Sequence, residues 1–242
     1  MKEEEIRLQI EKNWAKHLRI DYEVLRSKPF LLVVDEEKRG TLKLSVFTFV
    51  DRTVVSCDPE VKCVIEGKEN SFRLRSDEVP SSFGKSFRIN RKTSIKYLNP
   101  SNYVPFDPPD DFVVRRVNHG DKKAFYDFRS YCTREDLIEG YVELDHVAVF
   151  GAFFNSEIVA VSSIIEWNGI ADIGIITMPE FRDLGLGKAL GSKSSEWGIL
   201  NNRLVQYRHD VLNYGSLKVS RALGFREYAI EHELVYVGGE SS

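Results

Sequence analysis

The segment FRDLGLGKAL, residues 181–190, contains an arginine, two spaced glycines and a lysine directly after the apolar run ADIGIIT. Such an order predicts a strand, a tight turn and then a helix. The first N–H groups of a helix have no acceptor within the helix and lie at the positive end of its dipole. The spacing of Arg182, Gly185, Gly187 and Lys188 therefore indicates a turn that binds phosphate through its backbone. The alternative is a tight strand-to-helix connection that binds no ligand.

Two common phosphate-binding loops do not fit this segment. A P-loop has a glycine five positions before its Gly-Lys pair and a Ser or Thr after the lysine. This chain has Arg182 and Ala189 at those two positions. A dinucleotide-binding turn has a third glycine three residues after the second, where this chain has Leu190. The turn must therefore belong to another class of loop.

The elements around this turn follow a regular order between residues 111 and 237. Alternating or continuous apolar runs predict strands over residues 111–117, 146–154, 158–167, 170–177, 203–209 and 229–237. Helical spacing of apolar residues predicts helices over residues 119–132, 133–144, 187–200 and 213–225. The expected order is β-α-α-β-β-β-α-β-α-β, in which the three middle strands are joined by tight turns and form an antiparallel meander.

The turn and its setting resemble the GNAT superfamily of acyltransferases. The signature of that family is Gln/Arg-x-x-Gly-x-Gly/Ala between a central strand and a long helix, with Asn and a small residue before a later helix that ends in Gly-Phe. The matching positions are Pro179, Arg182, Gly185, Gly187, Asn213, Ser216 and the LGF that ends at Phe225. The resemblance implies an α/β fold of the GNAT acyl-CoA N-acyltransferase type, with a mixed, mostly antiparallel sheet and flanking helices.

The resemblance also implies acetyl-CoA as co-substrate, with no metal. The backbone of the turn would hold the pyrophosphate, and the strand that ends at Thr177 would pair with the pantetheine arm. The following strand, from Leu204, would splay away and open the cleft. Lys188 is either a phosphate contact or a solvated helix charge, and Asn213 also fits a plain helix N-cap. The cofactor residues implied are Ile175, Thr177, Arg182, Asp183, Leu184, Gly185, Leu186, Gly187, Lys188, Asn213 and Ser216.

Two carboxylates are candidates for the general base that takes a proton from an amine. Asp172 stands where the resemblance places a catalytic glutamate, and the bare Gly174 beside it is expected to leave room for an acceptor or a water molecule. Glu166 is the rival, and a solvated strand-end carboxylate is the plain alternative for both. The frequent tyrosine acid of the family is replaced by Ser220, for which Tyr131, Tyr141 and Tyr214 are substitutes.

The first hundred residues show no such chemistry. Apolar residues at a spacing of four from Ile6 to Leu18 predict a helix that packs on the strands after it. Residues 30–34 and 42–50 read as strands, and DEEKRG between them predicts a hairpin. A proline-rich stretch over residues 100–109 predicts a linker. We expect an α/β domain over residues 1–105, similar to a degenerate GNAT half, and the acetyltransferase domain over residues 106–242.

Composition limits the partners. The net charge is -3, which gives no basic excess for nucleic acid. The N-terminus lacks the apolar core of a signal peptide, and no run is long enough to span a bilayer. Cys57, Cys63 and Cys132 have no metal or disulfide spacing, so we expect free thiols and a cytoplasmic protein. The N-terminal half is expected to shape the acceptor side or to form a homodimer.

Three functions remain open from the sequence. The first is an N-acetyltransferase acting on a primary amine of a small molecule or a peptide. The second is an acetyl-CoA-binding sensor without efficient catalysis. The third is an interaction protein that has lost the cofactor, which the intact Gly-x-Gly opposes. The acceptor itself is not defined, because acceptor loops vary freely on one scaffold.

Overall fold

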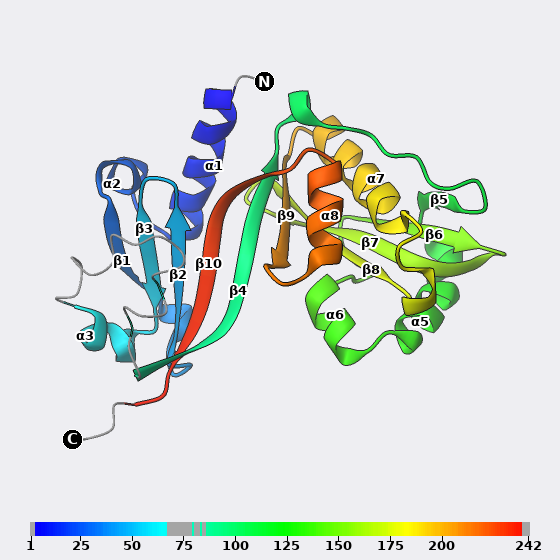
Figure 1. The fold of residues 1–242 in the computed structure, drawn as a ribbon. Helices are drawn as coiled ribbons and strands as arrows, with labels where there is room; N and C mark the ends of the chain where they lie inside the picture. The colour runs from blue at the N-terminus through cyan, green and yellow to red at the C-terminus, as the bar shows by residue number, and fades with distance from the viewer. Residues whose placement is uncertain (1–2, 67–78, 80–82, 84–85, 239–242) are drawn as a thin grey trace. The chain divides into compact units, whose positions relative to one another are not determined.

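The computed structural model describes residues 3–66, 79, 83 and 86–238, which form two compact units. Within the described residues, unit 1 comprises 3–6 and 96–226, and unit 2 comprises 7–66, 79, 83, 86–95 and 227–238. The elements of both units are labelled in Figure 1. Each unit is of the α/β class and is described separately.

Unit 2 has the strand order β1-β3-β2-β10-β4. In chain order its strands are β1 (Phe30–Val34), β2 (Lys43–Phe49), β3 (Thr53–Cys57), β4 (Phe87–Leu98) and β10 (Arg226–Tyr236). Its helices are α1 (Glu3–His17), α2 (Tyr22–Ser27), α3 (Lys62–Ile65), η1 (Glu36–Lys38) and η2 (Pro59–Val61). The Trp14 ring of α1 lies 4.8 Å from Phe47 and 5.4 Å from Phe49 of β2, between ring centroids. The predicted packing of this helix on the strands after it is therefore confirmed.

The predicted hairpin between β1 and β2 is wrong. β1 pairs in parallel with β3, and β2 pairs antiparallel with β3 and β10. The DEEKRG segment forms the short helix η1, capped by the Asp35 side chain, instead of a two-strand turn. A helical turn redirects the chain, so β2 enters the sheet on the far side of β3. The sequence pattern also did not indicate strand β4.

Unit 1 carries the predicted order of elements. Its strands are β5 (Val113–Arg116), β6 (Ala148–Phe154), β7 (Glu157–Trp167), β8 (Ile170–Thr177) and β9 (Leu204–Asp210). Its helices are α5 (Lys122–Tyr131), α6 (Arg134–Gly140), α7 (Leu186–Leu200) and α8 (Tyr214–Ala222), with η5 (Pro100–Asn102), η6 (His119–Asp121) and η7 (Pro179–Phe181). With β10 after α8, the order β-α-α-β-β-β-α-β-α-β is confirmed.

Strand order in unit 1 is β9-β8-β7-β6-β5. β5 to β8 pair antiparallel with their neighbours, which confirms the meander, and β8 pairs in parallel with β9. The mixed, mostly antiparallel sheet expected from the sequence is therefore present. β10 was expected to close this half of the chain, but its residues from Glu227 onward belong to unit 2, where they pair with β2.

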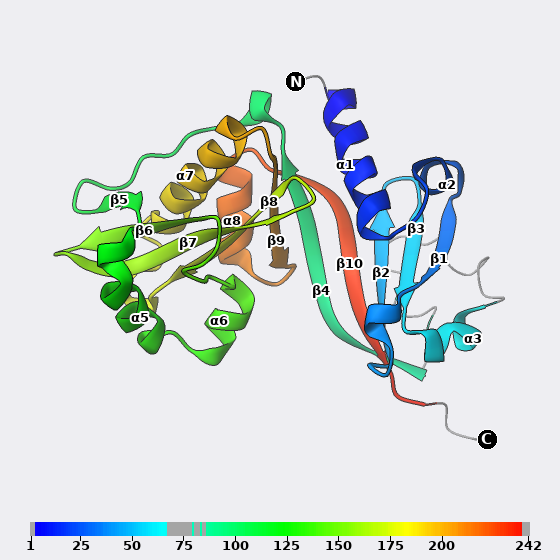
Figure 2. The ribbon, with the colours of Figure 1, turned by 180° about the vertical axis from the view of Figure 1, so that it is seen from behind.

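Helices cover both faces of this sheet (Figures 1 and 2). On one face, Leu186 and Leu190 of α7 pack with Ile173 of β8 in a buried cluster. On the other face, Phe125 and Phe128 of α5 pack in a second cluster with Ile176. The alternation of β8 side chains between these two clusters follows from the two-residue period of a strand.

The proline-rich stretch packs against α7. The Tyr103 hydroxyl lies 2.7 Å from Ser192 Oγ, and the backbone N–H of Phe106 donates to the same oxygen at 2.9 Å. Residues 96–106 therefore belong to unit 1 by packing. The domain boundary at residues 105 and 106 stays a prediction, because packing units and independently folding domains are different properties. In the described residues, no helix is both long and apolar enough to cross a membrane.

Gly174 of β8 is in contact with the end of α6. A Cβ atom at Gly174 would lie 2.0 Å from the Gly140 carbonyl oxygen, and one at Gly140 would lie 2.8 Å from the Ile175 carbonyl oxygen. The two glycines thus let a helix backbone lie directly on a strand backbone. The expected room for an acceptor or a water molecule beside Asp172 is therefore wrong, because the α6 backbone fills it.

We expect Gly174→Ala to lower the free energy of unfolding by about 1–3 kcal/mol, because the new methyl group meets a backbone oxygen that has no flexible side chain to move. Urea denaturation measures this change. Gly120→Ala is the control: its Cβ would lie 3.2 Å from the Asn118 side-chain oxygen, a much longer contact than the one at Gly174 and not one with backbone. Equal stabilities of the two variants would contradict the direct contact between α6 and β8.

Candidate functional site

Unit 1 contains a cavity of about 660 Å³ between the second halves of β8 and β9 and the first turns of α7 and α8. α6 forms a further part of its wall. The residues lining it are Asp136, Glu139, Gly140, Ile173, Gly174, Ile175, Ile176, Thr177, Phe181, Arg182, Asp183, Gly185, Leu186, Gly187, Lys188, Tyr207, Arg208, His209, Asn213, Gly215, Ser216, Lys218 and Val219. The cavity therefore joins the glycine turn to an opening in the sheet.

The opening results from the early end of the β8–β9 ladder. The two strands pair from Ile170 with Leu204 to Ile173 with Tyr207, and the register stops there. β8 continues to Thr177 and β9 to Asp210, both along the cavity wall. The expected divergence of the strand that starts at Leu204 is confirmed. It leaves Gly174–Thr177 with an edge that a ligand can pair with as an added strand does.

The turn before α7 has the conformation of a backbone anion site. Gly185 is the N-cap of α7 with φ of 87°, and Asp183 also has positive φ, 62°. The amides of Lys188 and Ala189 donate to the Gly185 carbonyl at 3.0 and 3.1 Å, which closes the first turn. The amides ahead of them precede the first intrahelical bonds, so they remain available to an anion at the positive end of the helix.

Arg182 links this turn to α6. Its Nη2 lies 2.8 Å from Asp136 Oδ1, and its Nε donates to the Thr177 carbonyl at 3.2 Å. Asp136 also belongs to the capping box with Thr133, the N-cap of α6. The arginine of the motif thus holds the end of β8, the turn and the start of α6 together, besides lining the cavity.

The other predicted cofactor residues lie on the cavity wall, with one exception. All of them line it except Leu184, which is exposed. Asn213 is the N-cap of α8, and its side chain accepts a hydrogen bond from the Ser216 amide at 2.9 Å. The plain capping role is therefore present, together with a position on the wall. Cofactor contact by these residues stays a prediction.

The positive charge of the cavity is concentrated on two lysines. Arg182 is paired with Asp136, and Arg208 is paired with Asp172. Lys188 Nζ lies 5.2 Å from the centroid of the Phe106 ring, and Lys218 lies on α8. Within the described part of the chain, neither lysine forms an ion pair. They are the cations best placed to meet an anionic ligand.

The candidate bases do not line the cavity. Asp172 is 4% exposed, and its Oδ2 accepts from Arg208 Nη2 at 2.6 Å and from Arg208 Nε at 2.8 Å. Its cavity contact is indirect, because Arg208 is on the wall. Glu166 pairs with Arg203 at 2.9 Å, and both lie outside the lining. The structure does not bring the two carboxylates together, and the role of each as base stays a prediction.

Ser220, the three proposed tyrosines and His146 lie outside the cavity lining. Ser220 is buried in α8, and its hydroxyl donates to the Leu217 carbonyl at 3.0 Å. The tyrosines proposed as substitutes, Tyr131, Tyr141 and Tyr214, are exposed. His146 Nδ1 lies 2.8 Å from Ser163 Oγ, and burial lowers the pKa of this imidazole.

Tyr207 is a cavity residue that the sequence did not indicate. It is 4% exposed and lies on the cavity wall together with Ser216. Burial raises the pKa of this phenol to about 12, so it is protonated at neutral pH. No motif surrounds Tyr207 in the sequence. Only the position at which the β8–β9 ladder ends brings it to the cavity.

The fold is that of the GNAT acyltransferases. A GCN5-related N-acetyltransferase from Sphaerobacter thermophilus superposes with a TM-score of 0.56 at 12% identity, over 93% of this chain and 90% of that one. A GCN5-related N-acetyltransferase from Kribbella flavida has a TM-score of 0.50 at 14% identity, over 68% of this chain and 64% of that one, just under two thirds of its length. No protein-family model matches the sequence, and no curated protein matches it.

We expect Lys188→Glu and Lys218→Glu each to weaken the binding of acetyl-CoA about tenfold or more, because each replaces an attractive charge near the phosphates by a repulsive one. Isothermal titration calorimetry at low and high salt measures the effect, which salt should reduce. The control is Lys193→Glu, with the same change of charge on a residue of α7 outside the cavity lining. Equal weakening of acetyl-CoA binding in all three variants would contradict a specific role of Lys188 and Lys218 in the cavity.

If Asp172 is the base, Asp172→Asn lowers turnover at least roughly a hundredfold and leaves acetyl-CoA affinity unchanged, because general-base catalysis contributes about 10²–10⁴-fold. Glu166→Gln should cost much less. Steady-state acetyl transfer across pH measures both, and thermal denaturation checks the effect of removing the partner of Arg208. A normal rate for Asp172→Asn together with failure of Glu166→Gln would transfer the role to Glu166.

Proposed function

We propose that this protein is a GNAT-superfamily N-acetyltransferase that moves an acetyl group from acetyl-CoA to a primary amine. The observation that carries the proposal is a single cavity in which an open strand edge meets a glycine-capped helix N-terminus. Acetyl-CoA has the matching parts in the same order: a pyrophosphate, a chain with two amides and a thioester. The fold supports the same function at the level of the superfamily.

Different residues of the cavity would bind the different parts of acetyl-CoA. The backbone amides from Asp183 to Gly187 would hold the pyrophosphate, and the side chains of Lys188 and Lys218 would supply positive charge; the Lys188 amide itself donates to the Gly185 carbonyl. The edge of β8 at Ile175 and Thr177 would pair with the pantetheine amides. Bound in this way, acetyl-CoA supplies an activated acyl group, and the protein excludes water from it and orients it.

The acceptor would approach a wall that carries carboxylates. Asp136 and Glu139 of α6 line the cavity, on the helix that contacts β8 at Gly174. Asp136 is matched by Arg182, and an amine acceptor that arrives protonated would meet Glu139 at this wall. A base must then remove one proton before the nitrogen attacks, and the thiol, with a pKa near 8.5, leaves as thiolate. A small amine or the amine of a peptide meets this description.

A sensor of acetyl-CoA without turnover is the second candidate. The observation that favours it is Ser220, which occupies the place of the frequent family tyrosine and whose hydroxyl is bonded to the Leu217 carbonyl. A cavity that binds acetyl-CoA but has no proton donor at the place of Ser220 would bind the molecule without transferring its acetyl group. Binding would then report the concentration of acetyl-CoA through the conformation of unit 1. Binding is common to both candidates, and only turnover separates them.

Acetyl-CoA at a hundredfold excess over its dissociation constant should stabilise the protein by about 2.7 kcal/mol, which differential scanning fluorimetry detects as a higher melting temperature. Release of free thiol in the presence of a panel of primary amines should then identify an acetyltransferase. Stabilisation without thiol release for every amine would favour the sensor. The absence of stabilisation would remove both functions.

A further inference from the structure

The proline-rich stretch lies along the face of α7 that continues from the glycine turn. The backbone N–H of Phe106 donates to Ser192 Oγ at 2.9 Å, and Ser192 is 4% exposed. Gly185, Lys188 and Ser192 are spaced by three and four residues, so they lie on one face of the helix. The segment that the sequence predicted as a linker is therefore attached to the face of α7 that carries two cavity residues, Gly185 and Lys188.

The Phe106 ring contacts both of these cavity residues. A Cβ atom at Gly185 would lie 3.3 Å from a carbon atom of the ring. The Lys188 Nζ lies over the ring, 5.2 Å from its centroid. An ammonium group within about 6 Å of an aromatic centroid is attracted to the negative face of the ring. The ring therefore keeps the ammonium group of Lys188 close to the glycine turn.

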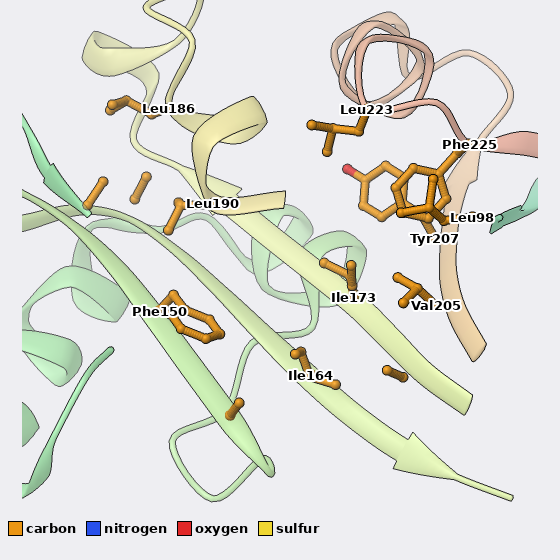
Figure 3. Close-up of a cluster of buried hydrophobic side chains, with 14 of the residues drawn as sticks. Leu98, Phe150, Ile164, Ile173, Leu186, Leu190, Val205, Tyr207, Leu223 and Phe225 are labelled. Carbon is orange, nitrogen blue, oxygen red and sulfur yellow. The ribbon is translucent and has the colours of Figure 1, made fainter. Parts of the chain in front are cut away.

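Packing holds the Phe106 ring in this place. The Val104 amide donates to the Leu223 carbonyl at 3.2 Å. A Cβ atom at Gly224 would lie 2.0 Å from the Asn102 carbonyl oxygen, so the backbone of the stretch is in direct contact with the end of α8. Figure 3 shows the buried cluster that includes Leu223, and Phe106 packs against this cluster. The ring is thus fixed by contacts with both α7 and the end of α8.

A neutral ring holds a lysine without matching its charge. The two arginines of the cavity, Arg182 and Arg208, are each paired with a carboxylate. An aromatic ring has no net charge, so Lys188 keeps its full charge and can donate its N–H groups to an anion on the side away from the ring. A flexible lysine also loses rotamer freedom when it binds a ligand, and restricting it beforehand reduces that loss. Both effects favour binding of an anion at the turn.

We propose that Phe106 is a positioning residue, which holds the Lys188 ammonium group beside the glycine turn so that it meets the phosphates of acetyl-CoA. This inference rests on the binding of acetyl-CoA in the proposed function. Phe106 is outside the cavity lining, so it acts through Lys188 and not by contact with the ligand. The proline-rich stretch is then a part of the donor site.

The test is a double-mutant cycle of Phe106→Leu and Lys188→Met, in which isothermal titration calorimetry at low salt measures the dissociation constant for acetyl-CoA. Leucine keeps an apolar side chain against the buried cluster and removes the ring, and methionine removes the charge. We expect Phe106→Leu alone to raise the dissociation constant about threefold or more. In the Lys188→Met background the same change should alter it less than about 1.5-fold, because the residue through which Phe106 acts is absent.

Two single variants separate the ring from general packing. Phe106→Tyr keeps the ring and should bind acetyl-CoA within about twofold of the unaltered protein. Phe30→Leu makes the same replacement at a half-buried residue of unit 2 and should bind like the unaltered protein. Weakening by either variant equal to that by Phe106→Leu would overturn the role of the ring.

The cycle also distinguishes this inference from the proposed function. Equal weakening by Phe106→Leu in both backgrounds, or no weakening in either, would overturn the role of Phe106 and leave the proposed function standing. No binding of acetyl-CoA by the unaltered protein would overturn the proposed function and the role of Phe106 together.

Discussion

The separation of β8 from β9 after Ile173 and Tyr207 is the constraint on which the site of unit 1 depends. Backbone N–H and C=O groups away from water need partners, so a sheet that opens internally must close the gap with something else. In this protein the separated parts of β8 and β9 line a cavity. A ligand that has amides of its own can pair there with the open edge of β8. The opening also brings the ends of α7 and α8 to the same space.

Two contacts hold the open strand in place from either side. On one face, the glycine pair Gly140 and Gly174 lets the end of α6 lie directly on β8. At the end of β8, Arg182 ties the Thr177 carbonyl to Asp136 at the start of the same helix. These contacts fix the part of β8 that has no partner strand on the β9 side.

Charge pairing differs between the arginines and the lysines of the cavity. Each of its two arginines is matched to a carboxylate, Arg182 to Asp136 and Arg208 to Asp172, so these guanidinium groups mainly fix the frame. The lysines Lys188 and Lys218 have no such match in the described residues. Unmatched lysines next to a helix N-terminus favour a ligand with several phosphates.

Local sequence determined the features that depend on near neighbours. The Gly185–Gly187 turn, the Asn213 cap and the order of elements in unit 1 all follow from residue spacing, since turns, caps and amphipathic periods involve residues a few positions apart. The role of Gly174 could not be predicted in this way, because a bare glycine reads equally as space for a ligand and as space for a helix.

Only the tertiary structure decided which distant residues meet. Tyr207 has no motif around it, and it becomes a cavity residue because the parallel ladder with β8 ends at its position. Asp172 reads as an open carboxylate in the sequence, yet it is buried against Arg208 of the next strand. β1 pairs with β3 instead of β2, and β10 joins unit 2. Strand pairing joins residues that are far apart in the chain. The local sequence pattern of a strand predicts neither which strand it pairs with nor how many residues take part in the pairing.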